Sequence, residues 1–96
     1  MSPKNKKKLN ILRKKLDNLD KKLLSVIKIR TEIIKRVILL KSSRNEIVDK
    51  KRITFILNKI KKESINKKID PAITTRIWKN MIWSYIAFER KNFKKK

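Results

Sequence analysis

Two basic side chains on one periodic stretch of the sequence could bind a small anion. Residues 9–40 carry apolar side chains three and four positions apart, and Arg30 stands where this pattern calls for a branched aliphatic residue. Lys41 follows eleven residues later, almost three helical turns, so both side chains would point the same way from one helix, about 16 Å apart. A charge on a packing face needs a partner, so this spacing predicts a small-anion site between Arg30 and Lys41. Taken alone, Lys41 is better interpreted as a solvated lysine at a helix end.

Arg13 and Glu89 are further candidates. Arg13 lies seventeen residues before Arg30, about 25 Å along the same helix and roughly a quarter-turn away. It cannot reach the same ligand within one chain, but an antiparallel two-fold pair brings the start of one helix beside the middle of the other. Glu89 stands on an apolar stripe, where an acidic residue usually forms a salt bridge. The more specific interpretation is that the Glu89 carboxyl group donates a hydrogen bond within a site.

The element that must position these arginines is one long helix with an uncovered apolar seam. Arg30 alone interrupts its a/d heptad pattern, which is formed by Leu9, Leu12, Leu16, Leu19, Leu23, Val26, Ile33, Val37 and Leu40. A helix of roughly 35 residues is about 50 Å long, and one short chain folding back cannot cover it. We therefore expect a partner molecule to pack on this seam.

Two further helices are predicted after the long one. Residues 42–45 favour a turn, and Asp49 is a good N-cap for a second helix that reaches about Lys62. A polar linker over residues 64–68 leads to the third helix. Asp70 followed by a proline is the clearest helix start in the chain.

The whole chain is therefore predicted to be a single all-α domain over residues 1–96. It would contain one long, one short and one medium helix, with residues 1–8 and 94–96 as basic tails. The chain has no Cys, no His and eight acidic residues, so neither disulfides nor a metal centre is expected. The absence of glycine leaves little scope for a phosphate-binding loop.

The net charge of +22, from 30 Lys and Arg against 8 Asp and Glu, suggests nucleic acid or an anionic membrane as a partner. The excess is mostly Lys and accompanies many Ile and Asn residues, a combination that an AT-rich coding sequence would give whatever the function. The lysines are also spread over all helical faces and both tails. A nucleic-acid partner is therefore not the favoured prediction, although a basic nucleic-acid-binding protein stays a third alternative.

A cytoplasmic protein without a membrane segment is expected. The charged residues 1–8 are followed by no apolar core of the length that a secretory signal needs. The sequence also contains no run of about 18 apolar residues.

The sequence resembles the all-helical chorismate mutases over about residues 9–93. Residues 12–24, LRKKLDNLDKKLL, look like the opening of that family, and Arg30 and Lys41 fall at its second arginine and its lysine. Residues 48–52, VDKKR, are similar to the family's V-x-D-x-x-R start of the second helix. Residues 70–71 and 81–89 match the start and the site-bearing part of its third helix.

This resemblance implies an intertwined, domain-swapped homodimer with two active sites, each borrowing one arginine from the other chain. Arg13 of the second chain and Arg30 would bind the two substrate carboxylates. Lys41 would donate a hydrogen bond to the ether oxygen whose bond breaks, and Glu89 would reach that oxygen from the other side. The full set of implied substrate contacts is Arg13, Arg30, Lys41, Asp49, Arg52, Ile53, Tyr85 and Glu89. Of these, Tyr85 is aromatic, and aromatic side chains more often pack in a core than contact a ligand.

The implied activity is the Claisen rearrangement of chorismate to prephenate in aromatic amino acid biosynthesis. It needs no nucleophile, proton relay, metal or cofactor. It needs a small dicarboxylate held in its compact conformer and fixed cations where the ether oxygen gains negative charge. Arginines suit bidentate carboxylate binding.

Two departures from the family pattern leave an alternative open. Glu89 stands where many bacterial members have glutamine and must be protonated to donate, so we predict a rate that falls as pH rises. Ile53 stands where many mutases have a glutamate that binds the substrate hydroxyl. Isochorismate pyruvate lyases share this fold and have a similar third helix, and their substrate lacks that hydroxyl, so conversion of isochorismate to salicylate and pyruvate is the alternative. Asp49 keeps the mutase-like pattern, unless it only caps a helix.

Overall fold

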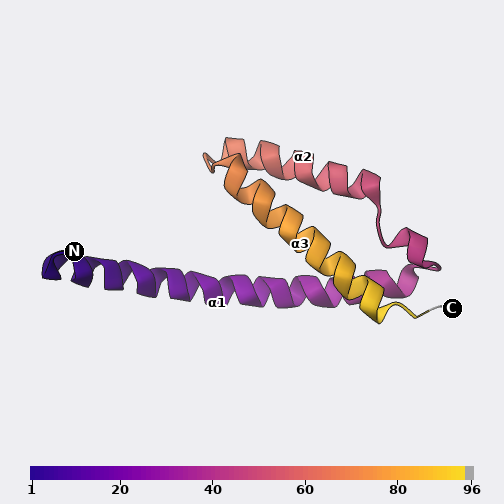
Figure 1. Cartoon of the computed structure of the whole chain (residues 1–96), viewed down its shortest axis with the longest axis horizontal. Helices are drawn as coiled ribbons and strands as arrows, with labels where there is room; N and C mark the ends of the chain where they lie inside the picture. Colours follow the sequence, from indigo (N-terminus) through magenta and orange to yellow (C-terminus); the bar gives the residue numbers. More distant parts are fainter. Residues whose placement is uncertain (95–96) are drawn as a thin grey trace. The chain divides into compact units, whose positions relative to one another are not determined.

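The structure is a computed structural model that describes residues 1–94 (Figure 1). It contains three α-helices and one short 3₁₀ segment, and no strand among the described residues; the elements are α1 (Pro3–Leu40), η1 (Arg44–Glu46), α2 (Lys50–Asn66) and α3 (Pro71–Asn92). This confirms the predicted all-α class and the order of one long, one short and one medium helix. The chain divides into two compact units, residues 1–34 and residues 35–96.

Helix α1 begins earlier than the sequence pattern predicted. Its first residue is Pro3, so most of residues 1–8 is helical and not a basic tail. The backbone amide of Asn5 donates to the Ser2 hydroxyl oxygen at 3.2 Å, which satisfies one of the free amides of the first turn. Pro3 has no amide to satisfy and a backbone angle that suits the first helical position. Of the predicted C-terminal tail, Lys94 follows α3 outside any helix, and residues 95 and 96 lie outside the described part.

In residues 1–34, the apolar seam predicted from the heptads is exposed to solvent. Leu12, Leu16, Leu19, Leu23 and Val26 each expose more than half of their surface, from 53% to 59%. Apolar surface of this extent, arranged along one stripe, is stabilised when another surface removes it from water. That the seam packs on a partner stays a prediction.

In the second unit, α2 begins at a side-chain cap and ends in a left-handed turn. Asp49 is the N-cap, and its Oδ1 accepts a hydrogen bond from the Arg52 amide at 3.0 Å. The helix runs on to Asn66, so the predicted end near Lys62 and the linker at 64–68 were placed too early. Ser64 lies within the helix, and its hydroxyl donates to the Ile60 carbonyl at 2.6 Å.

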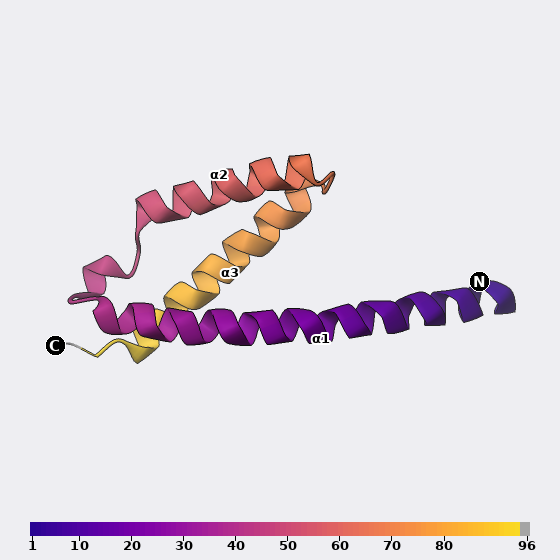
Figure 2. The same ribbon diagram turned by 180° about the vertical axis from the view of Figure 1, so that it is seen from behind.

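Helix α3 packs against α2 as an antiparallel pair joined by a tight turn (Figure 1, Figure 2). It begins as predicted, with Asp70 as N-cap accepting from the Ala72 amide at 2.9 Å and with Pro71 in the first turn. Ser64 and Thr74 place their hydroxyl oxygens 2.7 Å apart, which links the two helices beside the turn.

The core of the second unit forms where the end of α1, the segment after it and the last turns of α3 meet. The buried apolar side chains are Ile38, Ile47, Ile82, Ile86 and Phe93. Among the described residues, no helix has the length and apolar character needed to cross a membrane.

Candidate active site

A partly buried ion pair joins Lys41 to Glu89. The Lys41 ammonium lies 3.1 Å from Oε1 of Glu89, and the two side chains are 18% and 7% exposed. The same ammonium donates to the backbone carbonyl of Ile47 at 3.5 Å. Removing both charges from water is costly, and these contacts offset part of that cost. The result is a fixed ammonium beside a fixed carboxyl group, brought together from positions 48 residues apart in the sequence.

The segment that carries Lys41 is held by its own backbone and side chains. The Lys41 amide donates to the Ile38 carbonyl at 3.2 Å, at the end of α1. In η1, Oε2 of Glu46 accepts from the Ser42 amide at 3.3 Å, and the Ile47 amide donates to the Arg44 carbonyl at 3.1 Å. The Ile47 side chain is 3% exposed and anchors the segment in the core.

Glu89 is buried because it occupies the apolar face of α3. Ile82, Ile86 and Phe93 stand three or four residues from their neighbours on this stripe, with Glu89 between them, and all four are buried. An acid at such a position was predicted to form a salt bridge, and the contact with Lys41 confirms that. The second interpretation, a carboxyl group that donates a hydrogen bond to a ligand, stays a prediction.

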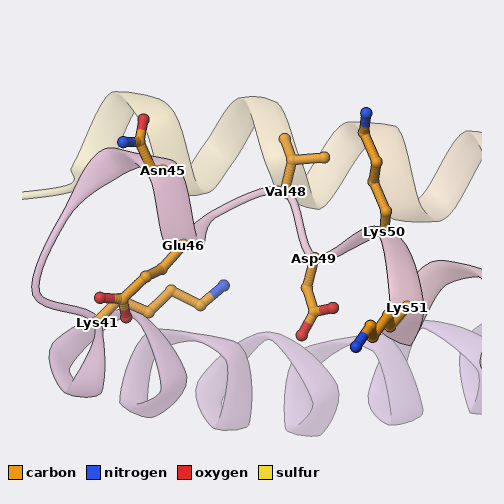
Figure 3. Close-up of a pocket in the computed structure, with 7 residues that line it drawn as sticks. All are labelled: Lys41, Asn45, Glu46, Val48, Asp49, Lys50 and Lys51. Atoms are coloured by element: carbon orange, nitrogen blue, oxygen red, sulfur yellow. The ribbon is translucent and has the colours of Figure 1, made fainter.

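An open pocket of about 580 Å³ lies beside Lys41. Its lining is formed by Lys41, Asn45, Glu46, Val48, Asp49, Lys50 and Lys51. Figure 3 shows Lys41, Asp49 and Lys51 on one side of the segment that links η1 to α2, whereas Asn45, Val48 and Lys50 point to the other side. The volume is in the range of small-molecule sites. Of the predicted site residues, Lys41 and Asp49 line this pocket.

The remaining predicted residues of the second unit lie on α2 and α3. Asp49 caps α2, so its carboxylate has the structural role that the sequence left open. The Arg52 guanidinium lies 5.3 Å from the centroid of the Phe55 ring, a cation–π contact. Ile53 on α2 and Tyr85 on α3 are half-buried.

Arg13 and Arg30 belong to the first unit. Both lie on α1; Arg13 is exposed and Arg30 is half-buried. Their participation in one site with Lys41 stays a prediction.

Sequence reasoning missed three features of this region. It did not identify Glu46, whose carboxylate braces the segment after Lys41, or the Ile47 carbonyl that accepts from the Lys41 ammonium. It also missed Lys51, which lines the same pocket as Asp49. Lys51 could have been found from the sequence, because it follows the predicted helix cap Asp49 by two residues. Glu46 and the Ile47 carbonyl depend on a turn geometry that no sequence pattern specified.

Among residues 1–94, no group of three or more His, Cys, Asp or Glu side chains is arranged to hold a metal ion. The chemistry that these residues offer is hydrogen bonding and charge stabilisation by an ammonium and a carboxyl group in a partly water-excluded place.

Comparison with known proteins identifies a family. The sequence model of the family described as chorismate mutase type II matches residues 12–90, which is well over half of the chain. No curated protein and no solved structure gives a significant match. The matched range begins one residue before Arg13 and ends one residue after Glu89, and therefore includes all the candidate residues.

Proposed function

This chain belongs to the chorismate mutase type II family, and from that membership we propose that it converts chorismate to prephenate. The observation that supports the reaction most directly is the contact of 3.1 Å between Lys41 and Glu89. An ammonium and a carboxyl group held this close could both approach one small acceptor atom, which supports the proposal.

The rearrangement is intramolecular: one carbon–oxygen bond breaks while a carbon–carbon bond forms, and no atom enters or leaves. In the transition state the ether oxygen gains negative charge. We assign Lys41 to donate a hydrogen bond to this oxygen, and Glu89, in its protonated form, to donate from the other side. Donors already fixed by the fold need no reorganisation as the charge develops, and a single such donor is typically worth about 10²- to 10³-fold in rate.

Binding must also hold the two substrate carboxylates and fold the substrate into its reactive conformer. We assign the carboxylates to Arg30 and to Arg13 of a second chain, because guanidinium groups bind carboxylates in a bidentate way. The remaining proposed contacts are Asp49, Arg52, Ile53 and Tyr85. The pocket beside Lys41, with a volume of about 580 Å³, is large enough for a substrate of this size.

The same proposal requires a homodimer in which the long helices pack on each other. The exposed seam of α1 supports it, because a second copy would supply a seam of the same pattern. Arg13 would then serve the site of the opposite chain.

The test is to incubate the protein separately with chorismate and with isochorismate. We expect prephenate from chorismate and neither salicylate nor pyruvate from isochorismate. Lys41→Ala and Arg30→Ala should reduce turnover at least 10²-fold by the loss of a fixed cation, while sedimentation shows that the dimer survives. The matched variants Lys59→Ala and Arg36→Ala remove exposed cations from α2 and α1 and should keep turnover. Near-wild-type turnover of Lys41→Ala or Arg30→Ala would contradict the site assignment.

The second candidate function is the isochorismate pyruvate lyase reaction. Two observations favour it: Ile53 offers an apolar, half-buried side chain where a hydroxyl-binding glutamate would suit chorismate, and the Asp49 carboxylate is used to cap α2. Salicylate from isochorismate, without prephenate from chorismate, would establish this alternative.

A further inference from the structure

A second cation from the segment after α1 holds the turn of α3 that carries Glu89. Nη1 of Arg44 donates to the backbone carbonyl of Arg90 at 3.0 Å. The guanidinium carbon of Arg44 also lies 5.5 Å from the centroid of the Phe93 ring. Arg44 therefore contacts α3 at the residue after Glu89 and again at the helix end.

The hydrogen bond and the ring contact both lie at the C-terminal end of α3. Arg90 is within the last four residues of α3. The carbonyl oxygens of these residues receive no hydrogen bond from an amide of the same helix. Phe93 is the C-cap, with extended backbone at φ −67° and ψ 129°, and its side chain is only 7% exposed. The hydrogen bond and the cation–π contact together fix a helix end, which is the part of a helix most prone to fraying.

Lys41 and Arg44 reach this turn from the same short segment. Lys41 pairs with the side chain of Glu89, and Arg44 binds the carbonyl of the next residue. The segment between them is braced by the bond from the Ser42 amide to the Glu46 carboxylate. A movement of the last turn of α3 away from η1 would therefore change the distance between the Lys41 ammonium and the Glu89 carboxyl group.

We propose that Arg44 is a positioning residue, which acts through the end of α3 to set the geometry of the Lys41–Glu89 pair. This inference rests on the proposed function for its kinetic consequence, because it assigns to Arg44 the placement of the two groups that face the ether oxygen. Arg44 itself touches no reacting atom. Its loss leaves the pair chemically complete but displaced, and a displacement of about 1 Å can cost on the order of 10²-fold in rate.

The first test observes the pair without any substrate. In protein labelled with ¹⁵N-lysine, the Lys41 ammonium, held by Glu89 and 18% exposed, should exchange its protons more slowly than lysines on the surface. The Lys41→Met variant identifies its signal by removing it. In Arg44→Ala and in Phe93→Leu, we expect this signal to shift and to broaden through faster exchange.

The second test measures turnover at a temperature at which circular dichroism shows each variant to be fully folded. Arg44→Ala should lower kcat about 10- to 100-fold and change KM little, because the carboxylate-binding arginines are untouched. Arg44→Lys keeps a donor and a positive charge and should recover part of the loss. The matched control, Arg90→Ala, removes an exposed guanidinium from the same turn but keeps the carbonyl that Arg44 binds, and both its kcat and its Lys41 signal should match the wild type.

The outcomes separate this inference from the proposed function. If the wild type converts neither substrate, the proposed function fails, while the Lys41 signal still reports whether Arg44 positions the pair. An unshifted Lys41 signal in folded Arg44→Ala, or a kcat within twofold of Arg90→Ala, would overturn the positioning role. If Arg44→Ala does not fold, Phe93→Leu provides the same two measurements, and an unshifted Lys41 signal in that variant would overturn the positioning role.

Discussion

The carboxyl group of Glu89 has one neighbour that determines how it can act. The Lys41 ammonium already donates to its Oε1 at 3.1 Å, so in the free protein Glu89 is an acceptor. To donate to the ether oxygen of chorismate, Glu89 must carry a proton when substrate is bound. If Glu89 stays ionised, it can only orient Lys41, which would then be the sole donor of the pair. Only the donating role makes the rate fall as pH rises.

The substitution Glu89→Gln distinguishes these roles. We expect the wild-type rate to be highest at low pH and to fall as pH rises, because ionisation removes the donor. An amide donates at every pH, so the profile of Glu89→Gln should be flat and the variant should retain partial activity. The measurement is kcat between about pH 5 and about pH 8 in buffers of constant ionic strength.

Glu63→Gln is the control, because it changes an exposed glutamate on α2 by the same chemistry. Its pH profile should follow the wild type. A wild-type kcat that does not vary over this range would contradict a Glu89 donor that is lost by ionisation between these pH values. It would leave the orienting role.

At the scale of elements, side-chain caps and apolar spacing predicted most of the helices. Asp49 and Asp70 cap α2 and α3 as expected, since each carboxylate accepts from an amide of the first turn. The start of α1 was misplaced although Ser2 and Pro3 present the same kind of signal as Asp70 and Pro71. Runs of lysine concealed it, because charge density favoured a frayed tail.

The candidate site was less predictable than the helices. The contact between Lys41 and Glu89 joins positions 48 residues apart, and only a family resemblance, not spacing, suggested that they meet. The role of Arg44 depends on the path of the turn from residue 41 to residue 47 and on where α3 ends. No residue pattern specifies that path in a segment without glycine or proline.

The turn between α2 and α3 contains a conformation that its residue type does not favour. Lys68 has φ of 59°, in the left-handed region. Its amide donates to the Ile65 carbonyl at 3.1 Å, and the Ile69 amide donates to the Ser64 carbonyl at 2.8 Å. This is the Schellman arrangement, in which the position of Lys68 is usually occupied by glycine.

We expect Lys68→Gly to stabilise the protein by about 0.5–1 kcal/mol. Relief of the strain of a Cβ at positive φ, worth about 1–2 kcal/mol, outweighs the added entropy of glycine in the unfolded chain. The measurement is the midpoint of urea unfolding at fixed protein concentration. The matched variant Lys67→Gly, at φ −89°, gains no such relief and should be neutral or destabilising. A lower midpoint for Lys68→Gly than for the wild type would contradict this account of the turn.

At the scale of the whole molecule, the net charge of +22 should attract a substrate that carries two negative charges. This holds whatever the reason for the lysine-rich composition. A positive field raises the local concentration of the substrate and its rate of association, and salt screens that field. We therefore expect kcat/KM to fall between about 0.01 M and about 0.15 M salt, as the Debye length shortens from about 30 Å to about 8 Å.

The turnover number should change little over the same titration, because it is measured with substrate already bound, when its capture no longer limits the rate. Measuring kcat and KM at each salt concentration separates the two effects. An uncharged osmolyte at equal osmolality controls for changes in water activity. A parallel fall of kcat and kcat/KM would show that salt acts on the catalytic groups or on folding, and not on substrate capture.

A site shared by two chains is the strongest requirement of the proposed function. If Arg13 of one chain completes the site that contains Lys41 of the other, then Arg13→Ala and Lys41→Ala damage every site of their own homodimers. Unfolding and refolding an equal mixture of the two variants produces heterodimers. In each heterodimer, one site carries both substitutions and the other carries neither. Half of the dimers are then heterodimers with one intact site of two, so the mixture should recover about a quarter of the wild-type activity.

The recovery depends only on where Arg13 acts. If Arg13 serves the site of its own chain, each site of the heterodimer keeps one defect and the refolded mixture stays inactive. Refolding each variant alone controls for gains due to refolding itself, and mixing without unfolding controls for slow exchange of chains.

The exposed leucines of α1 also predict the effect of Leu19→Asp, which places a charge within the seam. An uncompensated buried carboxylate opposes the packing of two seams. We therefore expect Leu19→Asp to give monomers that neither turn over substrate nor complement either variant.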